Sequence, residues 1–414
     1  MTSIQASRGT KDILSPEIYY WQHLEAIARQ ILTQAGYTEI RTPIFEATEL
    51  YTRGIGEATD IVGKEMYSFL DRGERSLTLR PEGTAGVVRA AIEHSLLGGV
   101  QRLWYLGPMF RYERPQAGRQ RQFHQLGVEV LGSDDPRVDV EVISLAVGFL
   151  ASLGISGLVV QLNSVGGVVD RQVYRQALVD YFTPLAADLD PDSRDRLNRN
   201  PLRILDSKDP NTQAIVAQAP QILDYLSQES KEHFHQVQQL LADLQIAVQL
   251  NPRLVRGLDY YTRTAFEIQS SLLGAQAAVC GGGRYDRLVA ELGGSRTPAV
   301  GWAIGLERLV ILLEKLGQPP LPRLDFYLVS RGELAQRQSV QVAAQVRKLG
   351  FTVELDVTGA KFDKQLKRAD AKGAIAALIL GDTEAAHQQI QVKWLKTGEQ
   401  QTISQAELDS LSLD

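Results

Sequence analysis

Hydrophobic positions recur along the chain at two different spacings, which predict helices in some segments and strands in others. Between Ser15-Pro16 and Gly36, apolar residues recur every three or four positions, which predicts an opening helix. Strand and hairpin patterns dominate residues 37–131. Later elements are predicted as a helix at Asp139–Leu153, strands at Leu158–Leu162, Thr264–Ile268 and Gln276–Cys280, and a helix at Ala303–Leu316.

Two changes in this pattern divide the chain. Residues at about 169–246 consist of long polar helical stretches and loops, which predicts a helical insertion. Residues 319–323 belong to a proline-rich stretch typical of a stiff linker. We therefore expect a first domain at 1–318 and a second at 324–414, in which strands and helices alternate as a compact parallel α/β unit. Its predicted elements are strand 325–330, helix 332–349, strand 351–355, helix 361–372 and strand 375–380.

Composition is that of an ordinary globular protein. Of the 414 residues, 44% are hydrophobic and 22% charged, and the net charge of −5 provides no global attraction to nucleic acid. No apolar run approaches the roughly 20 residues of a membrane span. Cys280 is the single cysteine, which excludes internal disulfides and thiolate zinc clusters, and the six histidines form no metal-ligand pattern. We expect a cytoplasmic protein without a membrane segment.

The most informative segment is an arginine-rich hairpin. Two strand-like runs, Leu103–Tyr112 and Gln122–Leu131, flank a turn at residues 115–118. The arginines around the turn are Arg111, Arg114, Arg119 and Arg121. Guanidinium groups pair with phosphate oxygens and stay charged, so the hairpin suits a polyphosphate. The second strand places Phe123, Gln125, Gly127 and Glu129 on one face, which suggests the floor of a small-molecule pocket. The alternative is a solvated hairpin with surface arginines.

Three other segments carry candidate chemistry. Glu82 and Thr84, on a turn after a strand, could accept hydrogen bonds from an ammonium group, or could cap the next helix. Residues 256–261 read Arg-Gly-Leu-Asp-Tyr-Tyr, and 281–286 read Gly-Gly-Gly-Arg-Tyr-Asp, with the glycines expected between a strand and a helix. In the predicted helix Arg308 would share a face with Ile304 and Leu312, so it is expected to meet either an anion or a buried acid. Neither the dinucleotide nor the P-loop glycine pattern occurs.

Together these segments closely resemble the histidyl-tRNA synthetases, which are class II aminoacyl-tRNA synthetases. Residues 36–43 resemble motif 1 of that class, the arginine hairpin resembles motif 2, and residues 305–308 resemble motif 3. The segments at 256–261 and 281–286 resemble the two histidine-specific motifs. Trp302 stands where the family more often has phenylalanine. The resemblance implies an α+β fold, with an antiparallel catalytic sheet flanked by helices, a helical insertion and a C-terminal anticodon-binding α/β domain. It also implies a homodimer, with motif 1 at the interface.

The implied reaction activates L-histidine with ATP and transfers it to the 3′ end of histidine tRNA. By resemblance, Arg111 holds the α-phosphate and the histidine carboxylate, and Arg256 stabilises the charge that develops at the α-phosphorus. Arg308 takes the γ-phosphate, while Arg119 and Arg121 line the nucleotide side. Mg²⁺ accompanies the β- and γ-phosphates and is held largely by ATP, without a protein-only metal site.

The resemblance also assigns the histidine contacts. Glu82, Thr84 and Gln125 would meet the α-ammonium group, and Glu129 and Tyr261 the two imidazole nitrogens. Tyr260 and Tyr285 complete the implied histidine site. The main rival is a regulatory paralogue that partners ATP phosphoribosyltransferase, which shares the fold but typically lacks the anticodon domain and the signature residues.

A basic stripe marks the C-terminal domain. Its residues, at helical spacing, are Lys361, Lys364, Arg368 and Lys372. The apolar residues Phe362, Leu366 and Ala369 are expected on the opposite face. Such a stripe is ordinarily a solvated face. On a module that resembles an anticodon-binding domain, we expect it to contact the tRNA backbone.

Overall fold

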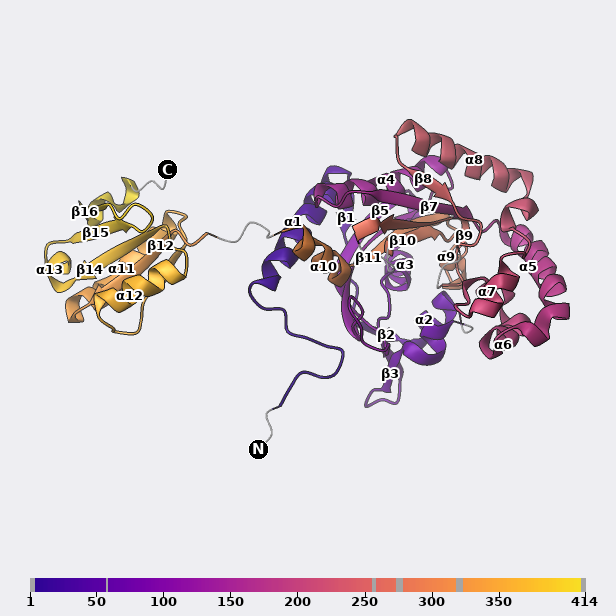
Figure 1. Cartoon of the computed structure of the whole chain (residues 1–414), viewed down its shortest axis with the longest axis horizontal. Helices are drawn as coiled ribbons and strands as arrows, with labels where there is room; N and C mark the ends of the chain where they lie inside the picture. Colours follow the sequence, from indigo (N-terminus) through magenta and orange to yellow (C-terminus); the bar gives the residue numbers. More distant parts are fainter. Residues whose placement is uncertain (1–3, 57–58, 255–257, 273–277, 318–322, 411–414) are drawn as a thin grey trace. The chain divides into compact units, whose positions relative to one another are not determined.

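The computed structural model describes residues 4–56, 59–254, 258–272, 278–317 and 323–410. The chain separates into two compact units, Met1–Pro319 and Pro320–Asp414, each with its own core (Figure 1). Within the described ranges, no helix is both long and apolar enough to cross a membrane.

The first unit combines helices with one large sheet and one small one. Its strands are β1 (Thr38–Glu39), β2 (Phe45–Ala47), β3 (Tyr67–Leu70), β4 (Ser76–Leu79), β5 (Gln101–Phe110), β6 (Gln122–Leu131), β7 (Leu158–Ser164), β8 (Val248–Leu250), β9 (Thr262–Ser270), β10 (Ala278–Arg284) and β11 (Ala299–Gly305). Its helices are α1 (Glu17–Gln34), α2 (Thr48–Ile55), α3 (Thr84–Glu93), α4 (Pro136–Ser152), α5 (Val168–Phe182), α6 (Pro191–Arg199), α7 (Pro210–Val216), α8 (Gln228–Asp243), α9 (Leu288–Glu291) and α10 (Leu306–Leu316).

The large sheet is antiparallel except at its edges, which confirms the expected class of fold. Its strand order is β1-β5-β6-β11-β10-β9-β7-β8. Only the outer pairs, β1 with β5 and β7 with β8, run parallel among the described strands. β5 and β6 form the predicted hairpin, paired from Gln101 opposite Leu131 to Phe110 opposite Gln122.

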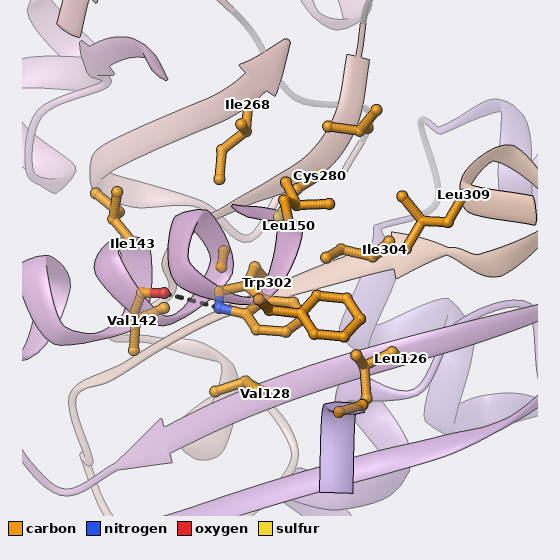
Figure 2. Packing of buried hydrophobic residues seen from close by; sticks show 14 of the residues in the cluster. Leu126, Val128, Val142, Ile143, Leu150, Ile268, Cys280, Trp302, Ile304 and Leu309 are labelled. Atoms are coloured by element: carbon orange, nitrogen blue, oxygen red, sulfur yellow. Dashed lines mark hydrogen bonds between the residues drawn. The ribbon is translucent and has the colours of Figure 1, made fainter. Parts of the chain in front are cut away.

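Alternation along the central strands divides the sheet into a core face and an open face. On β6, Leu126, Val128 and Val130 belong to the main core. On β11, Trp302 packs among side chains of α4, and its indole Nε1 donates a hydrogen bond of 2.8 Å to the carbonyl of Val142 (Figure 2). α1, α4, α8 and α10 contribute to this core. The other face carries a smaller cluster that includes side chains of α3 and α9.

The block expected at about 169–246 is helical. α5, α6, α7 and short 3₁₀ turns enclose a core of their own, which includes Tyr174, Leu178, Phe182 and Ile204. α8 returns to the sheet and packs on α4, with Phe234, Val237 and Leu241 in the main core. The insertion is therefore attached to the helical layer that covers the core face.

The second unit is a mixed sheet with helices. Its elements are β12 (Phe326–Arg331), α11 (Glu333–Lys348), β13 (Val353–Leu355), α12 (Phe362–Ala371), β14 (Ala376–Gly381), α13 (Asp382–Ala386), β15 (Gln389–Trp394) and β16 (Gln400–Ser404). β13, β12 and β14 run parallel, as predicted. β15 and β16 add two antiparallel strands, so the expectation of a wholly parallel unit was incomplete.

Several elements differ from prediction: residues 37–131 contain the helices α2 and α3 besides strands, and two boundaries shift beside the central strands. Gly281, Gly282 and Gly283 lie within β10, not between a strand and a helix. Glycine fits inside this strand because the backbones of β10 and its neighbours approach closely there. The helix expected from Ala303 begins at Leu306. Residues 299–305 form a strand, in which Val300, Trp302 and Ile304 alternate toward the core.

A substitution at Gly282 tests the close packing of the central strands. A Cβ atom on Gly282 would lie 2.3 Å from the carbonyl oxygen of Gly301 and 2.7 Å from Cβ of Trp302. Because a strand backbone cannot give way locally, we expect Gly282→Ala to lower the free energy of unfolding by about 1–3 kcal/mol, measured by urea denaturation. The control is Gly148→Ala, at an open position on α4, where alanine should stabilise by about 0.5–1 kcal/mol. Equal stability of the two variants would contradict the packing described here.

Candidate active site

A cavity of about 460 Å³ lies on the open face of the large sheet. Strands β6, β9, β10 and β11 contribute lining residues, as do the turn before α3 and the hairpin loop. The lining includes ten of the residues selected from the sequence: Glu82, Thr84, Arg111, Arg119, Gln125, Glu129, Tyr260, Tyr261, Tyr285 and Arg308. Side chains from segments far apart in the chain therefore meet in one space. Their meeting there disfavours a merely solvated hairpin.

Glu82 caps the start of α3, which is one of the two roles considered for this turn, and it also lines the cavity. Its carboxylate accepts hydrogen bonds from the backbone N–H of Thr84 at 2.7 Å and of Ala85 at 2.8 Å, at the start of α3. Burial raises the pKa of Glu82, although these donors oppose the rise. The two interpretations of this turn are compatible, because a carboxylate oxygen can accept more than one hydrogen bond.

Glu129 lies at the closed end of the cavity, with 1% of its surface exposed. The Thr84 hydroxyl donates to its Oε1 at 2.7 Å, and the Tyr285 hydroxyl donates to its Oε2. Burial raises the pKa of Glu129 to about 8, although the two hydroxyl donors favour the charged form. A carboxyl group that titrates near neutral pH can either donate or accept a proton toward a ligand.

Aromatic rings form the wall beside Glu129. The ring centroid of Tyr260 lies 4.8 Å from that of Tyr261 and 5.5 Å from that of Tyr285. Behind this wall, Arg171 of the insertion donates to the carbonyl of Tyr261 at 2.9 Å. Gln125, on β6, has a buried Oε1 with no hydrogen-bond donor in the part of the chain that the structure describes. A ligand with an N–H or O–H group could donate the missing hydrogen bond to that oxygen.

Arginines gather at the more open part of the cavity. Arg111 donates from Nε to the carbonyl of Pro81 at 2.8 Å, and its guanidinium lies 5.3 Å from the ring centre of Phe123. Arg119 lies 3.5 Å from the carboxylate of Glu113. Arg308, half-buried on α10, donates from Nη1 to the carbonyl of Ala278 at 2.7 Å. The expected helical face joining Arg308 to Ile304 was wrong, because Ile304 lies in β11.

Arg121 is placed differently from the other predicted arginines. It is not part of the cavity lining, and its guanidinium lies over the ring of Tyr112, 3.9 Å from the centroid. The backbone N–H of Arg121 donates to the carbonyl of Gly9 at 2.7 Å, and the Arg121 side chain occupies the space beside Gly9. Arg256, one of the two residues predicted for catalysis together with Arg111, lies outside the described residues.

Sequence reasoning missed several acidic residues at the cavity. Glu65, Glu113 and Glu267 also line it. Glu113 could have been noticed, since it lies in the arginine hairpin, whereas Glu65 and Glu267 had no local motif to mark them. No group of three or more His, Cys, Asp or Glu residues that could hold a metal ion is found among the described residues.

The basic stripe of the second unit is only partly available. Phe362, Leu366 and Ala369 pack toward the sheet, as expected. Arg368 lies 2.6 Å from the carboxylate of Asp356, and Lys372 forms an ion pair with Glu354. Lys361 and Lys364 are exposed, and no ion pair engages them within the described part of the chain. The four positive charges thus share a face, but two of them are partly neutralised.

Known proteins resemble this chain over nearly its whole length. Residues 9–309 match the family model for histidyl-tRNA synthetase, and residues 326–411 match that for an anticodon binding domain. A histidine–tRNA ligase of Picosynechococcus is 68% identical over 410 residues, covering 99% of this chain and 96% of the relative. The apo histidyl-tRNA synthetase of S. aureus is 38% identical, with a TM-score of 0.84 and 99% of both chains covered.

A more distant structure shares the fold alone. It is described as an ATP phosphoribosyltransferase regulatory subunit/histidyl-tRNA synthetase from Bacillus halodurans, and it is 22% identical, with a TM-score of 0.66. The match covers 89% of this chain and 97% of that one. The rival regulatory paralogue was expected to lack an anticodon-binding domain, and residues 326–411 of this chain match the model of one.

The raised pKa of Glu129 predicts how stability depends on pH. Its pKa is about 8 in the folded chain, against an ordinary value of 4.5, so the folded state binds this proton more tightly than the unfolded state. The contribution of Glu129 to stability therefore falls as pH rises from 4.5 to about 8. We expect the stability of Glu129→Gln, relative to the parent, to increase over that range in urea denaturation.

A carboxyl group on α4 provides the control. Glu141 accepts a 2.8 Å hydrogen bond from Arg102, and although burial favours its neutral form, Arg102 and Tyr37 hold the pKa of Glu141 below its ordinary value. Its contribution is complete above pH 4.5 and is lost only at lower pH. The difference between Glu141→Gln and the parent should therefore be flat from pH 4.5 to 8. A flat difference for Glu129→Gln as well would refute the proposed titration.

Proposed function

Because this chain belongs to the histidyl-tRNA synthetase family, we propose that the cavity on the open face of its sheet binds histidine and ATP and forms histidyl-adenylate. The activity is the ATP-dependent ligation of histidine to tRNA by a class II aminoacyl-tRNA synthetase. One observation carries the placement: a buried carboxyl group with hydroxyl donors and a cluster of arginines belong to the same cavity. Such a cavity has separate places for a side chain and for phosphates.

The closed part of the cavity suits the amino acid. A neutral imidazole has one N–H donor and one acceptor nitrogen, and we assign these to Glu129 and Tyr261. The α-ammonium group has three N–H donors, for which Glu82, Thr84 and Gln125 supply oxygens. Gln125 supports this assignment, because its buried Oε1 has no donor among the described residues. Tyr260 and Tyr285 hold the surrounding wall.

The arginine part suits ATP. We assign Arg111 to the α-phosphate and the histidine carboxylate, Arg119 to the nucleotide, and Arg308 to the γ-phosphate, because their guanidinium groups line the same space. Arg121 would have to leave the ring of Tyr112 to contact the nucleotide, so we propose that it braces the loop instead. The role of Arg256 at the α-phosphorus is carried over from the family resemblance alone.

The proposed reaction has two steps, and the assigned arginines act in the first. A carboxylate oxygen of histidine attacks the α-phosphorus, the bond to the β-phosphate oxygen breaks, and pyrophosphate leaves. A terminal tRNA hydroxyl then attacks the activated carbonyl carbon, and AMP leaves. Fixed arginines stabilise the negative charge that develops at the phosphate without reorganising. Mg²⁺ bound to ATP would supply further positive charge, and Glu113 and Glu267, which line the cavity, would offer it carboxylate oxygens.

The remaining partners are proposed from the family and from surface features. We propose that the second unit reads the anticodon, with Lys361 and Lys364 on the tRNA backbone. A homodimer is supported by exposed apolar side chains on the small sheet, including Phe45, Phe69 and Leu70. We propose the cytoplasm, where tRNA is charged for translation, as the site of action.

Histidine-dependent ATP–pyrophosphate exchange tests the activation step. The purified chain should exchange label with histidine and with none of the other standard amino acids, and should then charge histidine tRNA. No exchange from a folded protein would remove the proposed catalytic role. A sedimentation measurement that found an active monomer would overturn the proposed dimer.

The histidine subsite is tested separately from the ATP subsite. We expect Glu129→Ala to raise the KM for histidine by about a hundredfold or more while leaving the KM for ATP nearly unchanged, because an imidazole N–H would lose its buried partner. The measurement is exchange at varied histidine and at varied ATP. Arg119→Ala is the matched variant at the other end of the cavity, and it should affect ATP more than histidine. An unchanged histidine KM in Glu129→Ala would refute the assignment.

The tRNA contact is tested by charge removal on α12. Replacing both Lys361 and Lys364 by alanine should weaken tRNA binding without changing histidine-dependent exchange. The slope of log affinity against log salt concentration should become shallower by the equivalent of about two phosphate contacts. Lys372→Ala is the control, because Glu354 already partly neutralises that ammonium group. Titration of tRNA at several salt concentrations provides the measurement. Equal losses in the control and in the double variant would argue against a specific role for the two exposed lysines.

A further inference from the structure

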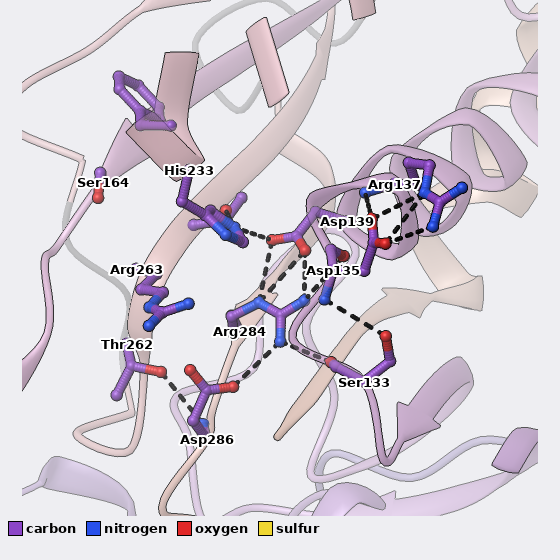
Figure 3. Close-up of polar contacts among 12 residues, drawn as sticks. Ser133, Asp135, Arg137, Asp139, Ser164, His233, Thr262, Arg263, Arg284 and Asp286 are labelled. Carbon is purple, nitrogen blue, oxygen red and sulfur yellow. Dashed lines mark hydrogen bonds and ion pairs between the residues drawn. The ribbon is translucent and has the colours of Figure 1, made fainter. Parts of the chain in front are cut away.

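A buried ion pair lies directly behind the proposed histidine subsite. Arg284 is the last residue of β10, Asp139 is in the first turn of α4, and neither side chain has any exposed surface. Arg284 donates from Nη2 to the Asp139 carboxylate at 2.5 Å and from Nε at 3.2 Å (Figure 3). Their positions are 145 residues apart in the sequence. The pair thus fastens a strand of the cavity to the helix on the opposite face of the sheet.

Further hydrogen bonds satisfy this pair. Arg284 also donates from Nη1 to the carbonyl of Ser133 at 2.8 Å and to the carboxylate of Asp286 at 3.1 Å. On the other side, Nε2 of His233, from α8, lies 3.4 Å from Oδ1 of Asp139 (Figure 3). Although burial favours the neutral acid, Arg284 holds the pKa of Asp139 at about 2, so the pair is ionic at neutral pH. Breaking such a buried pair leaves an uncompensated charge.

The residue after Arg284 belongs to the cavity. Tyr285 donates its backbone N–H to the carbonyl of Ala299 at 2.7 Å, and its hydroxyl donates to Glu129. The pairing of β10 with β9 shifts register between Gly283 and Arg284, so the strand is irregular where these side chains diverge. Arg284 is thereby directed to the helical layer, while Tyr285 is directed to the cavity. Arg284 and Tyr285 therefore hold the same end of the strand from opposite layers of the fold.

We propose that Asp139 is a positioning residue for histidine recognition, acting through Arg284 to fix the Tyr285 hydroxyl on Glu129. Asp139 itself has no contact with the cavity. This inference rests on the proposed histidine subsite and adds a residue to it. The ion pair fixes the end of β10, and the end of β10 fixes the hydroxyl that Glu129 requires. Through His233, the same carboxylate also joins the insertion to this end of the strand.

Asp139→Asn tests the proposal, since asparagine keeps the size of the side chain and removes its charge. We expect the KM for histidine to rise about tenfold or more, because Tyr285 loses its fixed position, while the KM for ATP changes little. Both are measured by ATP–pyrophosphate exchange, and histidine binding is measured directly by calorimetry. Glu141→Gln is the matched control on the same helix, because it breaks the ion pair with Arg102 away from the cavity. It should lower the melting temperature and leave both KM values unchanged.

A double variant distinguishes positioning from general stabilisation. If Asp139 acts through Tyr285, then Asp139→Asn should raise the histidine KM much less in a Tyr285→Phe background than in the parent. Additive effects would overturn the proposal, as would a histidine KM in Asp139→Asn that stays at the parent value. Should Asp139→Asn fail to fold, Asp286→Asn removes one contact of Arg284 and must show the same selective rise in histidine KM.

The outcome also separates this proposal from the placement of the histidine subsite. If Glu129→Ala raises the histidine KM and Asp139→Asn does not, only the positioning role fails. If neither variant changes it, the subsite itself is misplaced.

Discussion

A β-strand sends successive side chains to opposite faces of its sheet, and the first unit depends on this constraint. On β6, Leu126 and Val128 face the helical core, while Gln125 and Glu129 face the cavity. The same division continues at the end of β10, where Arg284 and Tyr285 are neighbours in sequence but serve different layers. A shift of register by one residue would bury the polar set in the core and expose the apolar set. The apolar core therefore also fixes which side chains face the cavity.

Two buried carboxyl groups show how surroundings decide protonation. Glu129 and Asp139 are both almost wholly buried, yet the pKa of Glu129 is raised to about 8 and that of Asp139 is lowered to about 2. Burial favours the neutral form of both. Glu129 receives neutral hydroxyl donors, whereas Asp139 is paired with the guanidinium of Arg284. The carboxyl group that faces the cavity can therefore exchange a proton, and the carboxyl group paired with Arg284 stays ionised.

Local patterns predicted most of this arrangement, and long-range contacts account for the rest. The bounds of β6 and ten of the residues lining the cavity could be inferred because alternation and short motifs mark them locally. The glycines of β10 misled prediction, since glycine usually ends a strand, and only the neighbouring backbone explains why Gly282 is needed. Asp139 carries no local signal, because its partner is 145 residues away. The pairing of Arg368 with Asp356 was also invisible to helical spacing alone.

The contact between Gly9 and the arginine hairpin links the start of the chain to the loop beside the cavity. The carbonyl of Gly9 accepts hydrogen bonds from the backbone N–H groups of both Arg121 and Gln122, where the loop joins β6. Gly9 has φ of +85° and no room for a Cβ beside Arg121, so glycine fits this position best. The loop that carries Arg119 to the cavity is thus closed by a segment more than a hundred residues earlier. A force applied to the segment around Gly9, for example by a protein fused to the start of the chain, would be transmitted to that loop through these hydrogen bonds.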